Sequence, residues 1–266
     1  MVCRARFTVA YDGSPFHGFA EQTAPSGQPT VMGVLRAAVE TVVRVPVVLV
    51  GAGRTDAGVH GWGQVVSLDL PQDTDLAALT HRLNRILAPH VVVREAGWAA
   101  DPQFSARFSA EWRHYRYLVL NDPVGNPLLA ASTWHVPQPL DLAVMRLACD
   151  PVIGEHDFSS FCRRPKVAPD VPEPSLTRRI LRAEWRRVPH DQTERLLLFE
   201  IRGQSFCHQM VRSLVGTMVD IGVGRRYAGE MRSILLARSR DAAGQVAPPH
   251  GLCLWEVGYP LAPGGT

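Results

Sequence analysis

The chain has little lysine and little cysteine. Lys166 is the only lysine among 28 cationic residues. The five cysteines are an odd number, lie far apart and form no CxxC pair, so neither a disulfide framework nor a structural zinc site is expected. The ten histidines are scattered without an HExxH spacing, and no metal is predicted from them.

Long apolar runs are also missing. The longest, such as residues 45–50, are far shorter than the roughly 20 residues that a membrane-spanning helix needs. The first residues, "MVCRARFTVAYDG", lack the apolar region of a secretory signal. We therefore expect a soluble, cytoplasmic protein that does not contact a membrane.

Length and composition predict a globular protein with a charge imbalance along the chain. At 266 residues with 46% hydrophobic residues, the chain can build one large domain or two ordinary ones. The net charge is +3, with 8 Arg against 9 Asp and Glu in residues 1–105, and 20 Arg and Lys against 16 in residues 106–266. Arginine clusters in the second half suit nucleic acid, although solvated strand faces have the same composition.

The first half has the pattern of an α+β unit. Strands are predicted at residues 4–11, 46–50, 64–70 and 91–98, and helices at 30–43, with Thr30 as the cap, and 74–87. This is the order βαββαβ of a ferredoxin-like unit. We place this domain at residues 1–105.

The second half, residues 106–266, approximates the same order. Strands are predicted at 111–120, 178–188, 195–202 and 252–259, and helices at 140–149, 205–222 and 229–237. The four prolines of residues 165–174 predict an extended loop, and the strands around "PHDQ" a hairpin. The predicted fold class is α+β: two ferredoxin-like halves with a mixed, largely antiparallel sheet, helices packed on it and a central active-site cleft.

The string "GAGRTDAGVHGWGQVVSLDL", residues 51–70, places Asp56 among five glycines just before a strand. An aspartate in such a turn usually satisfies backbone amides. The segment lacks the Lys-Ser/Thr of a phosphate loop, and Asp56 occupies the place of the third glycine of GxGxxG. Nucleotide binding of these kinds is therefore not expected.

This string closely resembles the active-site motif of the tRNA pseudouridine synthase A family. Five further blocks resemble the family in the same order: "YDGSPFHGF", "FSARFSAEWRHYRYLV", "HDFSSF", "FCHQMVRSLVG" and "APPHGLCLWEVGYP". Departures occur at Phe19 and Ala20, where the family commonly has Gly-Trp-Gln after Gly18, and at Met32, a frequent glutamine. They concern contacts with RNA rather than the reaction.

The resemblance implies a role for each matched residue. Asp56 falls on the nucleophilic aspartate, Tyr115 on the base-stacking tyrosine and Arg212 on the arginine that pairs with the aspartate. Arg54 matches an arginine that helps to extrude the target base, and Leu252 an apolar residue near the reacting uracil. Further RNA contacts are expected at His60 and Gln64, and at Arg163, Arg164, Arg178 and Arg179 as phosphate ligands.

The implied function is the isomerisation of uridine to pseudouridine at positions 38, 39 and 40 in the anticodon stem-loop of tRNA, by a homodimer and without a cofactor. An ionised carboxylate can attack the sugar or the base, or abstract a sugar proton, and the sequence leaves these routes open. Arg212 would favour the charged carboxylate.

Two alternatives come from other classes of protein. A tRNA-binding or folding module with dispensable catalysis would not need Asp56, Tyr115 and Arg212 intact. A phosphotransferase that uses Asp56 would need a magnesium-binding carboxylate or a Lys-bearing loop, and "RTDAGVH" has neither.

Overall fold

The computed structural model describes residues 1–21, 27–164 and 171–260. The chain divides into two compact units, Met1–Arg113 with Cys253–Thr266, and His114–Leu252. The expected division at residue 105 kept the C-terminal strand with the second half, whereas the structure groups residues from Cys253 onward with the first unit.

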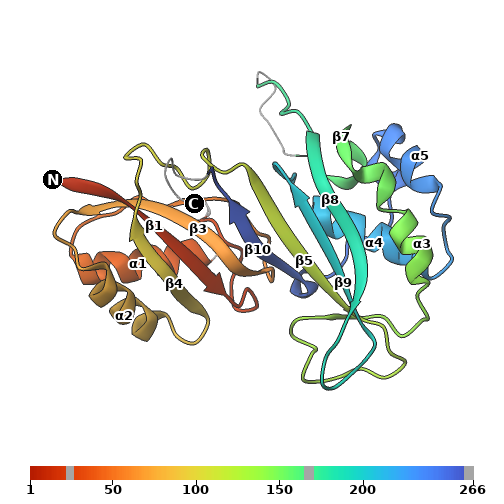
Figure 1. Cartoon of the computed structure of the whole chain (residues 1–266), viewed down its shortest axis with the longest axis horizontal. Coiled ribbons are helices and arrows are strands. Elements are labelled where there is room, and N and C mark those ends of the chain that lie inside the picture. Colours follow the sequence, from red (N-terminus) through yellow and green to blue (C-terminus); the bar gives the residue numbers. More distant parts are fainter. Residues whose placement is uncertain (22–26, 165–170, 261–266) are drawn as a thin grey trace. The chain divides into compact units, whose positions relative to one another are not determined.

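The first unit is a sheet with two helices. Its elements follow the predicted order βαββαβ: β1 (Val2–Tyr11), α1 (Val31–Val43), β2 (Val50–Gly51), β3 (His60–Pro71), α2 (Leu76–Leu87) and β4 (Val91–Trp98). Strand β1 pairs antiparallel with both β3 and β4, and β2 pairs antiparallel with β3. The last strand, β10 (Leu252–Gly258), adds to β3 in parallel, with Cys253 opposite His60. Figure 1 shows α1 and α2 beside β1, β3 and β4.

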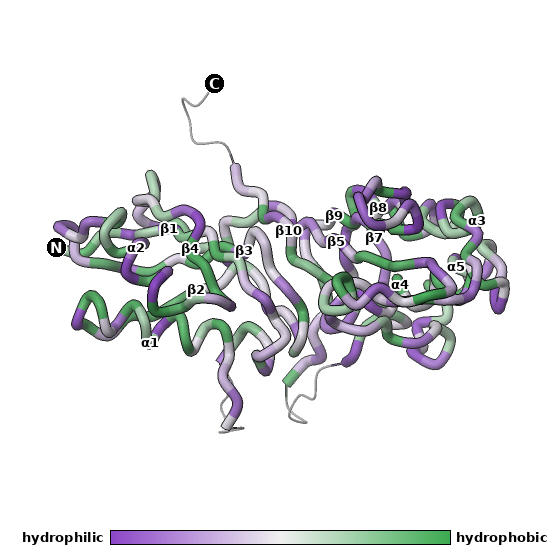
Figure 2. Tube along the Cα trace, turned by 90° about the horizontal axis from the view of Figure 1, so that it is seen from below, coloured by the Kyte–Doolittle hydropathy of each residue, from purple (hydrophilic) through white to green (hydrophobic). Residues whose placement is uncertain are grey.

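Both helices of this unit begin at side-chain caps. Thr30 accepts a hydrogen bond from the Gly33 amide at the start of α1, as predicted, and Asp75 accepts from Ala77 and Ala78 at the start of α2. Figure 2 shows hydrophilic and hydrophobic residues side by side along α1. Its buried residues, among them Leu35 and Val39, pack in one core with Phe7 and Val9 of β1 and Val66 and Leu68 of β3.

The second unit is a sheet of antiparallel strands in the order β5–β9–β8–β7. The strands are β5 (Trp112–Leu120), β7 (Gly154–Asp157), β8 (Thr177–Val188) and β9 (Leu196–Gly203), and a short β6 (Trp134–His135) lies parallel to β5. The helices are α3 (Leu142–Leu147), α4 (Met210–Gly222) and α5 (Glu230–Ala237). Short 3-10 turns lie at Asp150–Val152, Ser159–Phe161, Arg240–Ala242 and Pro249–Gly251.

The core of this unit lies between the sheet and α4. Every residue of α4 except Arg212 is buried. Trp185 of β8 stacks beside Phe199 of β9, with ring centroids 5.1 Å apart, and its Nε1 donates to Met218 Sδ of α4 at 3.2 Å. The β8–β9 pairing confirms the hairpin predicted around "PHDQ".

Several predicted elements were wrong in extent: the strand predicted at 64–70 begins at His60, and the helix predicted at 140–149 spans only Leu142–Leu147. Only Val50 of the predicted strand 46–50 pairs with a neighbour, because Val47 and Leu49 are buried in the core of the first unit while the Val47 amide donates to Glu40 Oε1. The helix predicted from residue 205 begins at Met210, after Gln209 with a left-handed φ of 64°. Residues 165–170 of the predicted proline-rich loop lie outside the described residues.

The observed elements form an α+β fold with a mixed sheet pattern, as the sequence predicts. Within the described residues, no helix is long and apolar enough to cross a bilayer.

Candidate functional site

Asp56 lies in the loop between β2 and β3, which hydrogen bonds hold at several points. The Thr55 carbonyl accepts from the Phe19 amide at 3.1 Å, and the Thr55 hydroxyl is 2.9 Å from the buried Tyr11 Oη. The Asp56 carbonyl accepts from the Val59 amide at 3.1 Å. The backbone that carries the half-buried Asp56 is therefore fixed from both sides.

The glycines around this loop allow close backbone contacts. A Cβ on Gly13 would lie 2.1 Å from the Val59 carbonyl oxygen, which is a severe clash. Gly18 has a left-handed φ of 90°, and a Cβ there would approach the Thr55 carbonyl to 3.0 Å. Both positions belong to the block "YDGSPFHGF", so this block acts as the support of the Asp56 loop.

Two long side chains hold the other end of the loop. Gln64 of β3 is fully buried, and its Nε2 donates to the Gly53 carbonyl at 2.9 Å. Arg113 Nη2 donates to the Ala52 carbonyl at 2.9 Å and to the Arg107 carbonyl at 2.8 Å. From the sequence we expected Gln64 at the RNA surface and did not identify Arg113, whereas the geometry gives both a part in positioning the loop.

Arg54 and His60 flank Asp56 in this unit. The Arg54 side chain is exposed. His60 Nδ1 accepts from the Gly13 amide at 3.2 Å and lies 3.2 Å from Asp12 Oδ1. Burial raises the pKa of Asp12, but hydrogen bonds from Ser14 and His90 outweigh burial and lower this pKa. A negative charge is thus maintained beside His60.

In the second unit, Tyr115 of β5 is buried on the same face of the strand as Tyr117 and Val119. Its ring packs edge-on against Phe206, with centroids 5.0 Å apart and an interplanar angle of 81°. The contact fixes the orientation of the Tyr115 ring. Phe206 was not identified as a functional residue from the sequence, although it lies in the matched block "FCHQMVRSLVG".

Arg212 lies in the first turn of α4 and is tied to a distant segment. Its Nε donates to the Ala247 carbonyl at 2.7 Å, and its own carbonyl accepts from the Ala247 amide at 3.1 Å. A Cβ on Gly216, one turn further, would lie 1.9 Å from the Gln245 carbonyl oxygen. Gly216 therefore permits the close approach of this backbone to α4.

The same segment continues to Leu252. Tyr117 Oη donates to the Pro248 carbonyl at 2.8 Å, and a Cβ on Gly251 would lie 2.6 Å from the Tyr117 ring. Burial raises the pKa of Tyr117 even though the Arg212 charge opposes this rise. Leu252 is 6% exposed at the end of the segment. Arg212 and Tyr117 are thus hydrogen-bonded to one short segment, residues 247–252, which ends at the predicted site residue Leu252.

The predicted phosphate ligands differ in their surroundings. Arg163, Arg164 and Arg179 are exposed, and Arg164 pairs with Glu173 at 3.2 Å on the surface, an ion pair of little energetic weight. Arg178 Nη1 instead donates to the carbonyls of Ser175 and Thr177 at 2.8 and 2.6 Å. This nitrogen of the guanidinium is committed to the local backbone.

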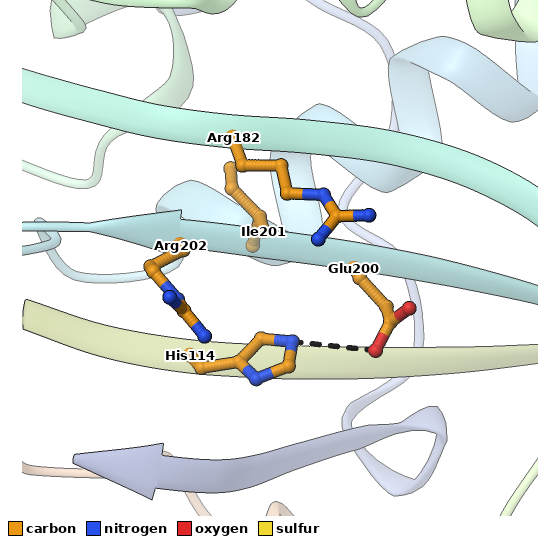
Figure 3. Close-up of a pocket in the computed structure, with 5 residues that line it drawn as sticks. All are labelled: His114, Arg182, Glu200, Ile201 and Arg202. Atoms are coloured by element: carbon orange, nitrogen blue, oxygen red, sulfur yellow. Dashed lines mark ion pairs between the residues drawn. The ribbon is translucent and has the colours of Figure 1, made fainter. Parts of the chain in front are cut away.

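A charged pocket on β5, β8 and β9 was not predicted from the sequence (Figure 3). It is lined by His114, Arg182, Glu200, Ile201 and Arg202. Glu200 accepts from Arg116 Nε at 2.7 Å and Arg186 Nε at 3.0 Å, and His114 Nε2 lies 3.4 Å away. Burial alone would raise the pKa of Glu200, but these arginines lower it. The feature of the sequence that could have indicated this pocket is Glu200, the single acidic residue in the apolar strand "LLLFEIRG".

Each unit thus carries part of the predicted site. The first holds Asp56, Arg54, His60 and Gln64, and the second holds Tyr115, Arg212, Leu252 and the four arginines expected at phosphates. In the first part, hydrogen bonds fix the backbone that carries Asp56. In the second part, Tyr115 packs against Phe206, and Arg212 donates to the Ala247 carbonyl.

The family model described as tRNA pseudouridine synthase matches residues 8–109 and 148–260. The chain belongs to the tRNA pseudouridine synthase family. The match includes Asp56 and Arg212, whereas Tyr115 lies between the two matched ranges. The predicted family resemblance is confirmed. The predicted enzyme class, a tRNA pseudouridine synthase and therefore an isomerase, is confirmed with it.

Curated relatives agree over nearly the full length. The chain is 43% identical over 263 residues to tRNA pseudouridine synthase A of Frankia casuarinae, covering 98% of this chain and 90% of the relative. Identity is 38% to the protein of that name in Gluconobacter oxydans (96% and 89% covered) and 36% to that in Bacillus licheniformis (96% and 99%). A solved Cbf5-Nop10-Gar1 complex aligns with 81% of this chain and 45% of its own, at 15% identity and a TM-score of 0.34, too low to bear on function.

Proposed function

We propose that this enzyme isomerises uridine to pseudouridine at positions 38, 39 and 40 in the anticodon stem-loop of tRNA, with Asp56 as the reacting carboxylate and no cofactor. The observation that carries the role of Asp56 is its loop, which is hydrogen-bonded to Tyr11 of β1 through the Thr55 side chain, and to Gln64 of β3 and Phe19 through backbone carbonyls. An aspartate in an ordinary turn does not need such an immobile setting. A carboxylate that must meet one atom of a substrate does.

The reaction breaks the bond between N1 of uracil and C1′ of ribose, turns the base and joins its C5 to C1′. The proton on C5 is then removed and N1 gains a proton, so atoms and electrons balance without a redox partner or ATP. The Asp56 carboxylate starts the reaction either as a nucleophile or as a base that abstracts a sugar proton. Both routes need the ionised carboxylate and the same position of Asp56.

Tyr115 and Arg212 complete the proposed machinery. The Tyr115 ring, already oriented by Phe206, would stack on the extruded uracil, with its hydroxyl directed toward C5. As the family resemblance implies, Arg212, whose Nε donates to the Ala247 carbonyl, would pair with the Asp56 carboxylate and keep it charged. Leu252 would provide the apolar contact to the uracil.

A uridine inside a stem must be unstacked before it reacts, and this requires a grip on the flanking backbone. We assign this grip to the exposed Arg54, Arg163, Arg164 and Arg179, with His60 as a further contact. Arg178 and Gln64 would contribute indirectly, since their side chains hold backbone carbonyls. The family resemblance also implies a homodimer, and we propose the cytoplasm as its place of action.

The direct test is tritium release from a tRNA transcript that is labelled at C5 of uridine and has uridine at position 39. Wild type and Asp56→Asn are assayed in parallel, and binding of the same tRNA is measured by filter retention. Release by wild type only, with binding by the variant within a few-fold, supports both the reaction and the role of Asp56. Equal release by both proteins would exclude Asp56 as the reacting carboxylate.

The alternative of a tRNA-binding or folding module has a distinct outcome in this assay. Tight binding without release from transcripts bearing uridine at 38, 39 or 40 would overturn the proposed substrate position and favour the binding module. Loss of tRNA binding in a well-folded Asp56→Asn protein would argue against a mainly chemical role for Asp56.

A further inference from the structure

Two cysteines from distant parts of the sequence meet beside the candidate site of the second unit. Cys162 follows the turn Ser159–Phe161, and Cys207 lies three residues before α4. The Arg163 amide donates to the His208 carbonyl at 3.0 Å, so the residues next to the two cysteines are joined backbone to backbone. The two side chains interact with each other, and each shifts the pKa of the other.

The immediate surroundings contain a cationic group that is only partly engaged. Cys207 Sγ lies 3.8 Å from the Leu176 carbonyl, which also accepts from the Phe158 amide at 3.1 Å and so closes one side. The Arg178 guanidinium acts on both thiols electrostatically. Although Nη1 of Arg178 donates to two carbonyls, its Nε is buried and has no hydrogen-bond partner among the described residues. A thiolate at Cys207 would have a positive charge beside it.

The two thiols are not equivalent. The interaction with Cys162 and the charge of Arg178 outweigh burial and lower the pKa of Cys207, which is partly exposed. Its interaction with Cys207 and its burial raise the pKa of Cys162, which is 1% exposed. An accessible thiol with thiolate character beside a protected neutral thiol is the arrangement of an attacking and a resolving cysteine.

We propose that Cys162 and Cys207 form a peroxide-reactive dithiol site that closes to a reversible disulfide. The Cys207 thiolate attacks one oxygen of hydrogen peroxide, which breaks the O–O bond and gives a sulfenic acid and hydroxide. The Cys162 sulfur then attacks the Cys207 sulfur, the S–S bond forms, and the sulfenic oxygen leaves as water with the thiol proton. Peroxide is the two-electron oxidant, and a thiol reductant reverses the change.

The disulfide would covalently join two segments that carry proposed site residues. Arg163 directly follows Cys162, and Arg212 lies five residues after Cys207. The segment between Cys207 and Arg212 includes Gln209 with its left-handed φ of 64°, so a shift at Cys207 must be absorbed at the start of α4. We therefore expect oxidation to lower turnover several-fold and a thiol reductant to restore it. Only this measurement of turnover rests on the proposed function; formation of the disulfide does not.

The test maps the disulfide in the full-length protein after treatment with a small excess of hydrogen peroxide, alkylation of free thiols and digestion with trypsin. The expected product links the peptide of residues 147–163 to that of residues 203–212 and disappears with dithiothreitol. Because Cys149 shares the first peptide, Cys149→Ser is the matched control. Cys149 is buried, and burial raises its pKa to about 12.

The linked peptide should persist in Cys149→Ser and be absent from Cys162→Ser, in which Cys207 sulfenic acid should accumulate and be trapped by dimedone. The proposal is overturned if wild type yields no linked peptide, or if the link involves Cys149. Loss of activity on oxidation without the link would also overturn the proposed mechanism. If the link forms and turnover is unchanged, the dithiol site is supported and its proposed effect on activity is overturned.

Discussion

A Cβ on Gly216 would lie 1.9 Å from the Gln245 carbonyl oxygen, so the chain entering the 245–252 segment touches α4 where that helix has no side chain. Two residues later, Ala247 holds Arg212 through both its amide and its carbonyl. Gly216 and Arg212 therefore act together. Gly216 lets the 245–247 backbone approach α4, and Arg212 forms hydrogen bonds to Ala247 in that backbone.

Gly216→Ala should therefore displace the segment that anchors Arg212. We expect the free energy of unfolding to fall by about 1–3 kcal/mol, the range for overpacking, and turnover to fall as well. Gly229→Ala is the control, because a Cβ there meets nothing within 4 Å and its φ of −62° suits alanine. Denaturant unfolding and tritium release measure both effects. Equal stability of the two variants would contradict this account of the contact.

The hydrogen bond between Tyr11 and Thr55 should matter for catalysis as well as for stability. Tyr11→Phe removes the buried hydroxyl that lies 2.9 Å from Thr55 Oγ1, which should cost about 1 kcal/mol of stability. Since the bond positions the residue next to Asp56, kcat should fall more than KM rises. Tyr259→Phe removes a comparable bond, to the Ala106 carbonyl at 2.8 Å, away from the loop. A similar fall in kcat for both variants would show that the effect is not specific to the loop.

Glu200 should make stability depend on acid pH. Arg186 and Arg116 hold its folded pKa below the ordinary value of 4.5, so its contribution is complete above pH 4.5 and is lost as the pH falls through the folded pKa. Glu200→Gln should lower the free energy of unfolding by about 1–3 kcal/mol at pH 7, and the difference from wild type should shrink as the pH falls below 4.5 and through the folded pKa.

Glu184→Gln is the control for this profile, since Glu184 pairs at 2.7 Å with an arginine whose side chain is 66% exposed. Its effect should stay within about 0.5 kcal/mol at every pH. A difference between wild type and Glu200→Gln that does not vary with pH would refute the assigned ion pairs.

Arg163 and Arg164 should contribute to the salt dependence of tRNA binding. Replacing both by alanine should weaken binding and reduce the slope of log K against log salt by about 1 for each phosphate that the variant no longer neutralises. Arg232→Ala on the exposed side of α5 removes a charge of the same sign and should leave the slope unchanged. If the double variant keeps the wild-type slope, these arginines are not phosphate ligands.

Elements with strong local signals could be predicted from the sequence. Helix α1 was expected from the Thr30 cap to residue 43 and is observed from Val31 to Val43, because its cap and apolar stripe are local. The residue at which α4 begins is not determined by local sequence. Backbone bonds from Arg163 to His208 and from Met210 to Cys207 impose another path on residues 205–209, which the apolar pattern does not encode.

The candidate site shows the same division. Sequence blocks identified Asp56, Tyr115 and Arg212, which remain proposals for the reaction. They did not identify the supports, because Gln64 and Arg113 act through backbone carbonyls that carry no sequence signal. The Glu200 cluster was missed because its arginines come from β5 and β8, which are distant along the chain.

The pairing of β10 with β3 has a consequence for biosynthesis. Residues 114–252 are, in topological terms, an insertion into the first unit, and Cys253 meets His60 only after they have been made. During translation, β3 and its Asp56 loop are made before residues 114–252, and this neighbour of β3 only after them. A nascent chain that stops short of residue 252 would retain every residue of the Asp56 loop while β3 lacks that strand, so the first unit would be completed only after the second has been made.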